Sequence, residues 1–495
     1  MKKLLLFSFF FFLFSFSFAQ YMIYGVTQAG YVSNQLQYGT IFNYNPVTHK
    51  QTTLFRFNDT DGRGFGRMLY ASDSLLYGLG RGGKYGEGTM YSFNPKTNIE
   101  TVLINFDSTN GYAGDGANEL IQAKDGLLYG ATWAGGKYGN GVLFSYDIHT
   151  HKDSTRCNFN DSTARGITGG TYMDLWQDPV TGILFGVTEL GGYPGQGGVV
   201  YGFNPATNKL VRYYVGTLNG INPWNFSGGF TQANNGLLYS LSWSGGSSDS
   251  GTIYSFNITS HTIQTVYSFS KVDGALPDGN ELVQLSNGLL YGGTRQGGDL
   301  AGDGVLFNYN LTTHKEKVLK TFHDTDGSQP VGRLIQYPGS DLLYGVTVYG
   351  GVGNFPGYGV FFSYDTGTST YTKLFNFTGP NGVYPVGLTL VKDTSVHVIN
   401  AGVASDAKGN IGEVKVYPNP GDGAFKFVIE SETKQSNPII EVYNVLGEKV
   451  YSKYQINNAS NYQVDLSSQP NGIYLYRIIA QSGGLIGEGK IIIQR

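Results

Sequence analysis

The side chains best suited to ligand contact occupy one position of a motif that the chain repeats seven times. The motif reads Leu-Leu-Tyr-Gly with small variations, and its aromatic residue falls at Tyr24, Tyr77, Tyr129, Phe185, Tyr239, Tyr291 and Tyr344. Four residues after this aromatic, the residue type varies among Gln28, Arg81, Trp133, Glu189, Trp243, Arg295 and Val348. A shared frame that presents different large or charged side chains is typical of a binding surface.

The chemistry of these varied side chains suits a glycan or a protein ligand. The indole rings of Trp133 and Trp243 can stack on sugars, and Arg81, Arg295 and Glu189 can hydrogen-bond hydroxyl or carboxylate groups. We therefore predict a non-catalytic binding surface that includes these five residues together with Gln28. Variation without function at an exposed loop is the alternative.

A hydroxyl residue directly precedes the varied position in six of the seven copies. These residues are Thr27, Thr132, Thr188, Ser242, Thr294 and Thr347. A hydroxyl that recurs at one place is most simply a structural hydrogen bond that caps the end of a strand.

Two acidic turns resemble part of a calcium loop. Asp59 and Asp61 lie in the sequence Asp-Thr-Asp-Gly, and Asp324 and Asp326 lie in an identical sequence. Alternate carboxylates before a glycine bend can direct oxygens toward a cation, but the further oxygen donors of a full loop are missing here. Asp and Gly also form ordinary turns, so calcium is the only cofactor considered and a plain turn is the alternative.

No motif for a nucleophile, a phosphate loop or a zinc-binding helix is present, so we predict no catalytic residue. A secreted polysaccharide hydrolase or lyase is the alternative, and such chemistry needs two carboxylates about 5–10 Å apart. Glu189 with Asp303 or Asp115 could supply them, but the sequence does not bring them together. The pair His149 and His151 lacks a local third metal ligand.

The spacing of the motif predicts a seven-bladed β-propeller. Successive copies are close to 53 residues apart, and each contains four short apolar segments separated by Gly- and Asp-rich turns. Both faces of such a sheet pack on neighbours, which explains why apolar residues follow one another without alternation. The loops after the second and fourth strands share one face of a propeller, and here they are the long, polar ones, so we expect the ligand on that face.

The ring is expected to close by strand exchange. The first copy lacks the strand that precedes the motif elsewhere, and the missing strand follows the seventh copy at residues 386–390. Closure of this kind leaves no exposed sheet edge. We therefore expect the propeller to span residues 20–391.

Composition limits the choice of partners. Charged residues make up only 14% of the 495 residues, and the net charge is −3, so no dense positive field is available for nucleic acid. The single cysteine, Cys157, excludes internal disulfides and is expected to be a buried apolar residue.

The first 19 residues have the features of a secretory signal peptide. Lys2 and Lys3 precede a run of about 13 apolar residues, which is short of the ~20 that span a bilayer. A membrane anchor is the alternative. No later segment is apolar enough to span, so we expect no transmembrane segment after the signal is removed.

The repeat region resembles the GloVer tandem-repeat proteins, which are exported bacterial proteins. The residues that carry the resemblance are Leu75–Gly78, Gly86–Tyr91 and their counterparts. The resemblance implies a surface location and brings no activity or catalytic residue.

The C-terminal region, residues 413–495, resembles the type A sorting domain of the type IX secretion system of Bacteroidota. A linker is expected at residues 392–412. The resemblance rests on Tyr417, Pro418, Asn419, Pro420, Gly447, Gly472, Gly489 and Lys490. It implies a small β-sandwich that the secretion machinery binds, and a secreted or outer-membrane surface location. An Ig-like binding module is the alternative.

Overall fold

The computed structural model describes residues 20–32, 35–113, 119–160, 175–218, 220–277, 281–299, 302–353, 357–393, 413–430, 439–444, 449–454, 461–479 and 485–495. These residues form two compact units, one in the repeat region and one in the C-terminal region. The predicted signal peptide and most of the predicted linker lie outside the described residues. Apart from a 3-10 turn at Asp324–Asp326, every regular element of the described chain is a β-strand.

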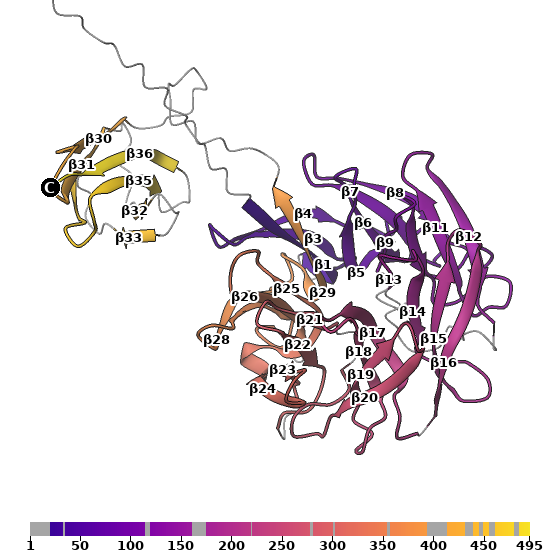
Figure 1. Ribbon diagram of the computed structural model, residues 1–495. Helices are drawn as coiled ribbons and strands as arrows, with labels where there is room; N and C mark the ends of the chain where they lie inside the picture. The colour runs from indigo at the N-terminus through magenta and orange to yellow at the C-terminus, as the bar shows by residue number, and fades with distance from the viewer. Residues whose placement is uncertain are drawn as a thin grey trace, which may run out of the picture. The chain divides into compact units, whose positions relative to one another are not determined.

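Seven antiparallel sheets that resemble propeller blades make up the repeat region (Figure 1). The second to fourth sheets consist of β5 (Arg63–Tyr70), β6 (Leu76–Arg81), β7 (Thr89–Asn94) and β8 (Ile99–Asn105), then β9 (Ile121–Gln122), β10 (Leu128–Ala131), β11 (Val142–Asp147) and β12 (Lys152–Asn158), then β13 (Trp176–Gln177), β14 (Leu184–Thr188), β15 (Gln196–Asn204) and β16 (Lys209–Thr217). The fifth to seventh sheets consist of β17 (Trp224–Gln232), β18 (Leu238–Ser244), β19 (Thr252–Asn257) and β20 (Thr262–Ser268), then β21 (Val283–Gln284), β22 (Leu289–Thr294), β23 (Val305–Asn310) and β24 (Lys315–Thr321), then β25 (Ser328–Gln336), β26 (Leu342–Tyr349), β27 (Val360–Asp365) and β28 (Thr370–Asn376).

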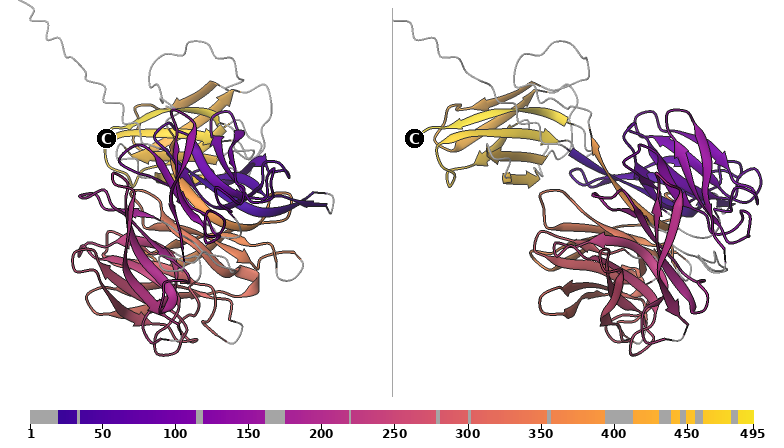
Figure 2. Two further views of the ribbon diagram at one scale, coloured as in Figure 1. Left: turned by 90° about the vertical axis from the view of Figure 1, so that its right-hand side faces the viewer. Right: turned by 45° about the vertical axis from the view of Figure 1, so that its right-hand side comes forward.

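The first sheet combines strands from both ends of the repeat region. It contains β1 (Gln20–Val32), β2 (Gln35–Gln37), β3 (Thr40–Asn45) and β4 (Lys50–Arg56), and β29 (Val383–Asp393) pairs with the free side of β1. Ile23 faces Leu390 and Gly25 faces Leu388 in this antiparallel ladder. The indigo and orange strands accordingly lie together in the views of Figure 2. β29 occupies the place that the first strand takes in the other six sheets.

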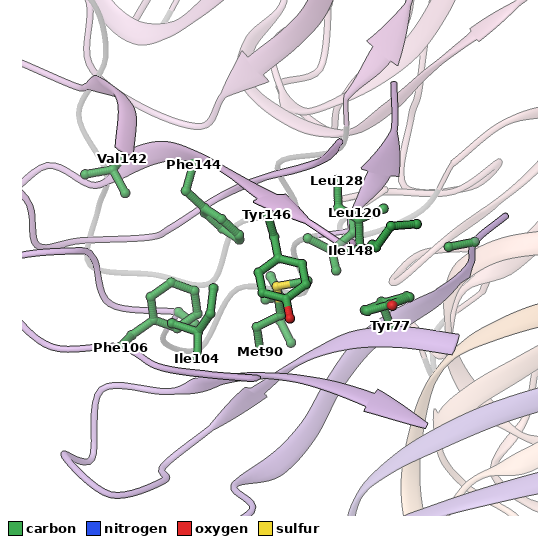
Figure 3. Close-up of a cluster of buried hydrophobic side chains, with 13 residues drawn as sticks. Tyr77, Met90, Ile104, Phe106, Leu120, Leu128, Val142, Phe144, Tyr146 and Ile148 are labelled. Carbon is green, nitrogen blue, oxygen red and sulfur yellow. The ribbon is translucent and has the colours of Figure 1, made fainter. Parts of the chain in front are cut away.

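Buried apolar side chains join each sheet to the next. Between the second and third sheets, Met90, Phe106 and Tyr146 share one such cluster (Figure 3). Equivalent clusters follow around the region, and the last contains Phe361 of the seventh sheet with Phe42 of the first. The seven sheets are therefore linked in a circle.

Burial on both faces accounts for the unbroken apolar runs of the motif. Leu128 packs toward the second sheet, while its neighbour Tyr129 packs toward the fourth. Both side chains are fully buried. The glycine that follows the aromatic leaves room for a ring from the next strand, since a Cβ atom on Gly78 would lie 2.4 Å from Tyr91.

The repeated hydroxyl has the structural role that the sequence predicts. All six side chains are fully buried, and each hydroxyl donates to the backbone carbonyl two residues later at 2.8–3.1 Å. Thr132 also accepts a hydrogen bond from the Val142 N–H at 2.9 Å. The second copy has Gly80 instead, and Thr89 on the facing strand supplies the hydroxyl, which donates to the Asp61 carbonyl.

Two sheets pack around one core in the C-terminal unit. Their strands are β30 (Glu413–Tyr417), β31 (Ala424–Glu430) and β34 (Asn461–Asp465), then β33 (Lys449–Tyr454), β32 (Ile439–Asn444), β35 (Gly472–Ile479) and β36 (Leu485–Ile493). Phe427, Val442 and Ile491 meet in the shared core. Asn419 joins the Tyr-Pro-Asn-Pro segment to β36, because its side chain donates to the Lys490 carbonyl and accepts from the Ile492 N–H.

The other residues of the sorting motif have different surroundings. Tyr417 is exposed, and a Cβ atom on Gly489 would lie 2.6 Å from the Tyr476 hydroxyl, so this glycine leaves room for the ring. Gly472 begins β35. Gly447 lies outside the described residues.

Replacing Thr132 with valine tests the repeated hydroxyl. The valine keeps the shape but leaves the buried Val142 N–H without its partner, which costs about 1–3 kcal/mol, and removes one of the two hydrogen bonds to the Ala134 carbonyl, which still accepts from the Tyr112 N–H. The midpoint of urea unfolding of the full chain should fall. All four tryptophans lie in the repeat region, so tryptophan fluorescence follows that unit alone. Thr132→Ser is the control and should lose much less, and equal loss in both variants would contradict the role.

Candidate functional site

The loops between the second and third strands of the second and third sheets are built alike and present an exposed tyrosine at the tip. In the loop from Gly82 to Gly88, the Gly88 N–H donates to the Gly82 carbonyl at 2.7 Å, and the Lys84 N–H donates to Asn105. The next sheet repeats both contacts, from Gly141 to Gly135 and from Lys137 to Asn158. These bonds fix the loops, so their tips are preformed.

A tyrosine with a cation beside it recurs in three successive sheets. The side chains of Tyr85 and Tyr138 are 53% and 50% exposed, and the ammonium groups of Lys84 and Lys137 lie 5.0 and 5.2 Å from the respective ring centres. In the fourth sheet, Tyr193 is 69% exposed, and the Arg212 guanidinium donates to its carbonyl at 3.2 Å. We call these three tyrosines with their cations the tyrosine row.

The tyrosine row lies at one end of the sheets. Each sheet has the same order of antiparallel strands, so the loops that join the second strand to the third emerge at the same end of every sheet. Sheets two, three and four are consecutive and packed together. The sequence analysis did not predict the tyrosine row. Its three tyrosines nevertheless share a sequence pattern, because each follows a Gly-Gly pair by one or two residues.

The residues predicted to bind ligand differ in exposure. Arg81 is exposed, and Gln28, Trp133, Trp243 and Arg295 are half-buried. Glu189 is buried, as is Val348 at the same position of the seventh copy. Their role in binding stays a prediction.

Two of the half-buried residues contact a neighbouring part of the fold. The Trp133 ring lies 5.4 Å from that of Tyr112, and the Arg295 Nε donates to Gln329 at 2.8 Å. Tyr112 lies in the segment that leads from the second sheet into the third, and Gln329 lies near the start of β25 in the seventh sheet. These two side chains therefore contact the chain where it enters the next sheet.

In each acidic turn, a carboxylate oxygen accepts a hydrogen bond from a backbone N–H of the same turn. Asp61 accepts from the Asn58 N–H at 3.3 Å, and Asp326 accepts from the His323 N–H at 2.7 Å. The same contact occurs in the other sheet-to-sheet turns at Asn110, Asp273 and Asn381. An asparagine oxygen accepts this hydrogen bond in some turns and an aspartate oxygen in others. The turns therefore share the hydrogen bond and not a negative charge.

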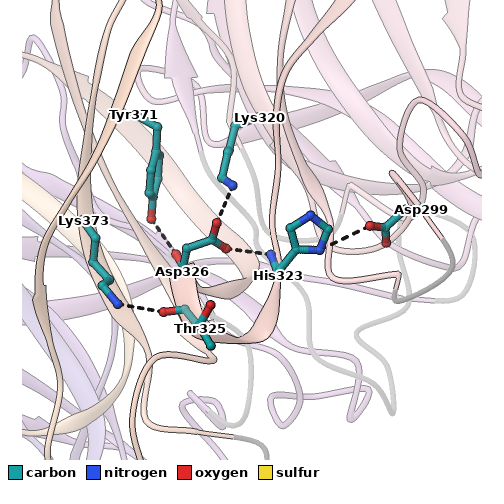
Figure 4. A network of polar contacts seen from close by, with 7 residues as sticks. All are labelled: Asp299, Lys320, His323, Thr325, Asp326, Tyr371 and Lys373. Atoms are coloured by element: carbon teal, nitrogen blue, oxygen red, sulfur yellow. Dashed lines mark hydrogen bonds and ion pairs between the residues drawn. The ribbon is translucent and has the colours of Figure 1, made fainter.

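Further contacts engage the second acidic turn (Figure 4). The Asp326 carboxylate also pairs with the Lys320 ammonium, and its backbone carbonyl accepts from the Tyr371 hydroxyl at 2.5 Å. His323 approaches Asp299 at 3.3 Å. Within the described residues, no three His, Cys, Asp or Glu side chains are grouped so that they could hold a metal ion. Calcium at Asp59, Asp61, Asp324 or Asp326 stays a prediction.

The histidines occupy turns with a left-handed backbone. His49, His151 and His314 have φ between 54° and 57°, a region that Asn fills in other copies, as at Asn98 and Asn208. Each of these histidine rings is hydrogen-bonded to a tyrosine hydroxyl through Nδ1. Cys157 is half-buried in β12, and burial raises the pKa of its thiol, which disfavours the reactive thiolate.

Four charged residues meet at the centre of the ring of sheets. Arg67 of β5 pairs with Glu119, and its Nε lies 2.5 Å from the carboxylate. Arg333 of β25 lies 3.6 Å from Glu281. Burial raises the pKa of Glu119, the nearby Glu281 raises it further, and Arg67 and Arg333 act in the opposite direction.

The first strands line this centre. A Cβ atom on Gly387 of β29 would lie 2.7 Å from the Arg67 Cα atom, so these two first strands touch. We call Arg67, Glu119, Glu281 and Arg333 the central cluster. The sequence carried a signal for it that was not used, because each of these charged residues directly precedes an apolar residue and stands ten or eleven residues before the motif aromatic.

The carboxylate pairs considered from the sequence have other surroundings. Asp303 accepts a hydrogen bond from the Ser328 hydroxyl at 2.6 Å. Glu189 is buried in the fourth sheet, and Asp115 lies outside the described residues. At the centre of the ring, the structure brings the carboxylates of Glu119 and Glu281 close enough for the charge of one to influence the other.

Two further glutamates are half-buried in equivalent outer strands. Burial, together with the negative charge of Asp61, raises the pKa of Glu100 from 4.5 to about 8. Burial and Asp273 raise the pKa of Glu316 to about 8 as well. One oxygen of each carboxyl is buried and accepts no hydrogen bond from the described residues. Both groups are therefore protonated over a wide range of pH in the folded chain.

Sequence comparison places the repeat region in a known family. The pattern of the Gloeobacter/Verrucomicrobia repeat matches residues 19–192 and 171–414. The chain belongs to the Gloeobacter/Verrucomicrobia repeat family. The secretion system C-terminal sorting domain matches residues 415–494, so this repeat protein is exported by the type IX secretion system to the cell surface or the exterior. No curated protein gave a significant sequence match.

Solved structures are only distantly similar to this repeat protein. The extracellular domain assigned to a one-component system of B. thetaiotaomicron is 12% identical, with a TM-score of 0.44 over 92% of this chain and 60% of its own. TolB from Acinetobacter baumannii is 12% identical, with a TM-score of 0.39 over 61% and 63%. A fungal alcohol oxidase of the AA5 family in complex with copper is 10% identical, with a TM-score of 0.43 over 92% and 91%. The chain thus spans less than two thirds of the first two proteins.

The described part of the repeat protein holds no helix long and apolar enough to cross a membrane.

Replacing Glu100 and Glu316 with glutamine tests their raised pKa values. Between pH 4.5 and 8 the folded chain keeps protons that the unfolded chain releases, so these groups make the free energy of unfolding fall as pH rises. The double variant should match wild type in melting temperature near pH 5 and exceed it increasingly toward pH 8. Tryptophan fluorescence measures both. A difference that does not change with pH would contradict the shifts.

Proposed function

We propose that this chain is a non-catalytic surface protein that binds a polysaccharide through the loop end of a seven-bladed β-propeller. In this proposal residues 20–391 form the propeller, with β29 closing the ring on β1 by strand exchange. Residues 392–412 are a linker, and residues 413–495 form a β-sandwich that the secretion machinery binds. The signal peptide at residues 1–19 starts the export.

The tyrosine row is the observation that carries the binding proposal. Tyr85, Tyr138 and Tyr193 are large rings exposed at the same loop of three successive sheets. Exposed aromatic rings contribute nothing to the core, and a row of them suits the apolar faces of successive sugars in a chain. Preformed loops lower the entropic cost of binding, because the tips need no ordering when ligand arrives.

A ligand that extends along the face could also reach the predicted positions between the sheets. Arg81 is exposed at the end of β6, in the strand that leads into the Tyr85 loop. Trp133 precedes the Tyr138 loop in the same way, and its ring packs against that of Tyr112. Gln28, Glu189, Trp243 and Arg295 complete the proposed surface as secondary contacts.

Removing the tyrosine row tests the function. The full chain is titrated with a panel of soluble polysaccharides by calorimetry, and Tyr85→Ala, Tyr138→Ala and Tyr193→Ala are then combined. If each ring contributes about 1 kcal/mol, binding of the best ligand weakens about a hundredfold. Val180→Ala at the opposite end of the fourth sheet is the control, because Val180 is exposed in the turn between β13 and β14.

Two results would count against the tyrosine row. Unchanged affinity in the triple variant would remove the row from the site. Loss of binding in Trp133→Ala with Trp243→Ala, and not in the triple variant, would move the site to the varied motif position. Melting temperature is measured for each variant, so that unfolding is not taken for lost contact.

A polysaccharide hydrolase or lyase is a second candidate, favoured by the central cluster. Glu119 is a buried carboxyl with a raised pKa, which is the form that a general acid takes. Glu281 is close enough to influence it and could act as the second carboxylate. Arg67 and Arg333 would neutralise the charge that develops.

Product analysis separates this candidate from pure binding. The full chain is incubated with the same polysaccharides, and new reducing or unsaturated ends are measured. A hydrolase or lyase should lose about 10²–10⁴-fold of this activity in Glu119→Gln. Glu189→Gln tests the carboxylate suggested by the sequence, and Lys96→Gln on the opposite end of the second sheet is the control. Absence of new ends with every polysaccharide would leave binding as the function.

A further inference from the structure

We propose that the tyrosine row binds an acidic polysaccharide, one that carries carboxylate groups on its sugars. This inference rests on the proposed function and names the ligand class of that site. It depends on the cations beside the rings, whereas the proposed function depends on the rings alone.

Each tyrosine of the row has a positive group held next to it, and two local arrangements provide it. Lys84 and Lys137 directly precede their tyrosines, and their ammonium groups stay within 5.0–5.2 Å of the ring centres. Arg212 reaches Tyr193 from β16, a separate strand of the fourth sheet. The lysines thus contact the rings of Tyr85 and Tyr138, whereas Arg212 is held at the backbone of Tyr193, so a cation accompanies each tyrosine through one of two different contacts.

A sugar acid needs these two groups side by side. The face of a pyranose ring is apolar and stacks on an aromatic ring, while its carboxylate projects from the edge and seeks a cation. A lysine that contacts one face of a tyrosine ring leaves the other face for the sugar. Its ammonium group then lies close to the carboxylate of that sugar. Tyr85 and Tyr138 remain half exposed beside their lysines, which leaves ring surface accessible to a ligand.

The corresponding loops of the fifth and sixth sheets have the opposite character. The corresponding loop of the fifth sheet carries Ser247, Ser248 and Asp249, and that of the sixth sheet carries Asp299. The turn that follows the sixth sheet adds Asp324 and Asp326. Asp326 is paired with Lys320, so Asp249, Asp299 and Asp324 are the acidic groups that would disfavour an acidic chain at sheets five and six.

Acidic side chains also occur near the row, both in the Tyr85 loop itself, at Glu87, and in turns between sheets. Asp107 precedes the third sheet, and its carboxylate accepts hydrogen bonds from Thr109 and from the Asn110 N–H. These bonds lower the pKa of Asp107, so the group is charged. The positive charges of Lys84 and Lys137 must outweigh this negative charge for the row to attract an acidic ligand. Removing both lysines should therefore abolish the attraction.

The test compares one polysaccharide with and without its charge. Polygalacturonate and its highly methyl-esterified form share the same sugar backbone, and only the first carries a carboxylate on most residues. The full chain should bind polygalacturonate at least tenfold more tightly at low salt, and the preference should shrink as sodium chloride rises. Lys84→Gln with Lys137→Gln should remove most of the preference, while Lys96→Gln should leave it unchanged.

The outcomes distinguish the ligand class from the function. Equal binding of both forms, lost in the triple tyrosine variant, would overturn the acidic class and leave polysaccharide binding in place. Binding of neither form, with a neutral polysaccharide bound instead, would overturn the inference in the same way. No binding to any polysaccharide would overturn both. Tyr85→Phe, Tyr138→Phe and Tyr193→Phe keep the ring faces and should retain affinity and preference.

Discussion

Burial of both faces of every sheet is the constraint on which the rest of the repeat region depends. Leu128 and Tyr129 are neighbours in sequence and pack against different sheets, so no sheet can bury its apolar surface alone. Each sheet needs a partner on either side, and only a circle supplies one to all of them. The pairing of β29 with β1 and the cluster of Phe42 with Phe361 meet this need at the junction of the two ends.

Much of this architecture could be predicted because it repeats. The period, the four strands of each copy, the capping hydroxyls and the strand that follows the seventh copy all recur as sequence patterns that one physical reason explains. The hydroxyl illustrates the limit as well. In the second copy Gly80 replaces it, and Thr89 supplies the group from the facing strand, a substitution that requires knowledge of which residues face each other.

The candidate site was less predictable, because it depends on exposure and on contacts between sheets. The varied motif position suggested accessible side chains, yet Glu189 is buried and Trp133 packs against Tyr112. Conversely, Tyr85, Tyr138 and Tyr193 looked like ordinary loop residues until their exposure was known. The central cluster joins residues from four copies of the repeat, and although a charged residue stands at an equivalent place in each of these copies, the sequence does not show that the four residues meet.

The exchange of β29 into the first sheet also has a consequence for the order of events during export. β1 and β29 stand at opposite ends of the repeat region, so the first sheet stays incomplete until the last strand of the region is available. Pairing over so long a stretch of chain is slow, since the intervening residues must be ordered first. If the polypeptide emerges N-terminus first from a membrane channel, the ring of sheets therefore stays open during the passage. It closes only after β29 has left the channel.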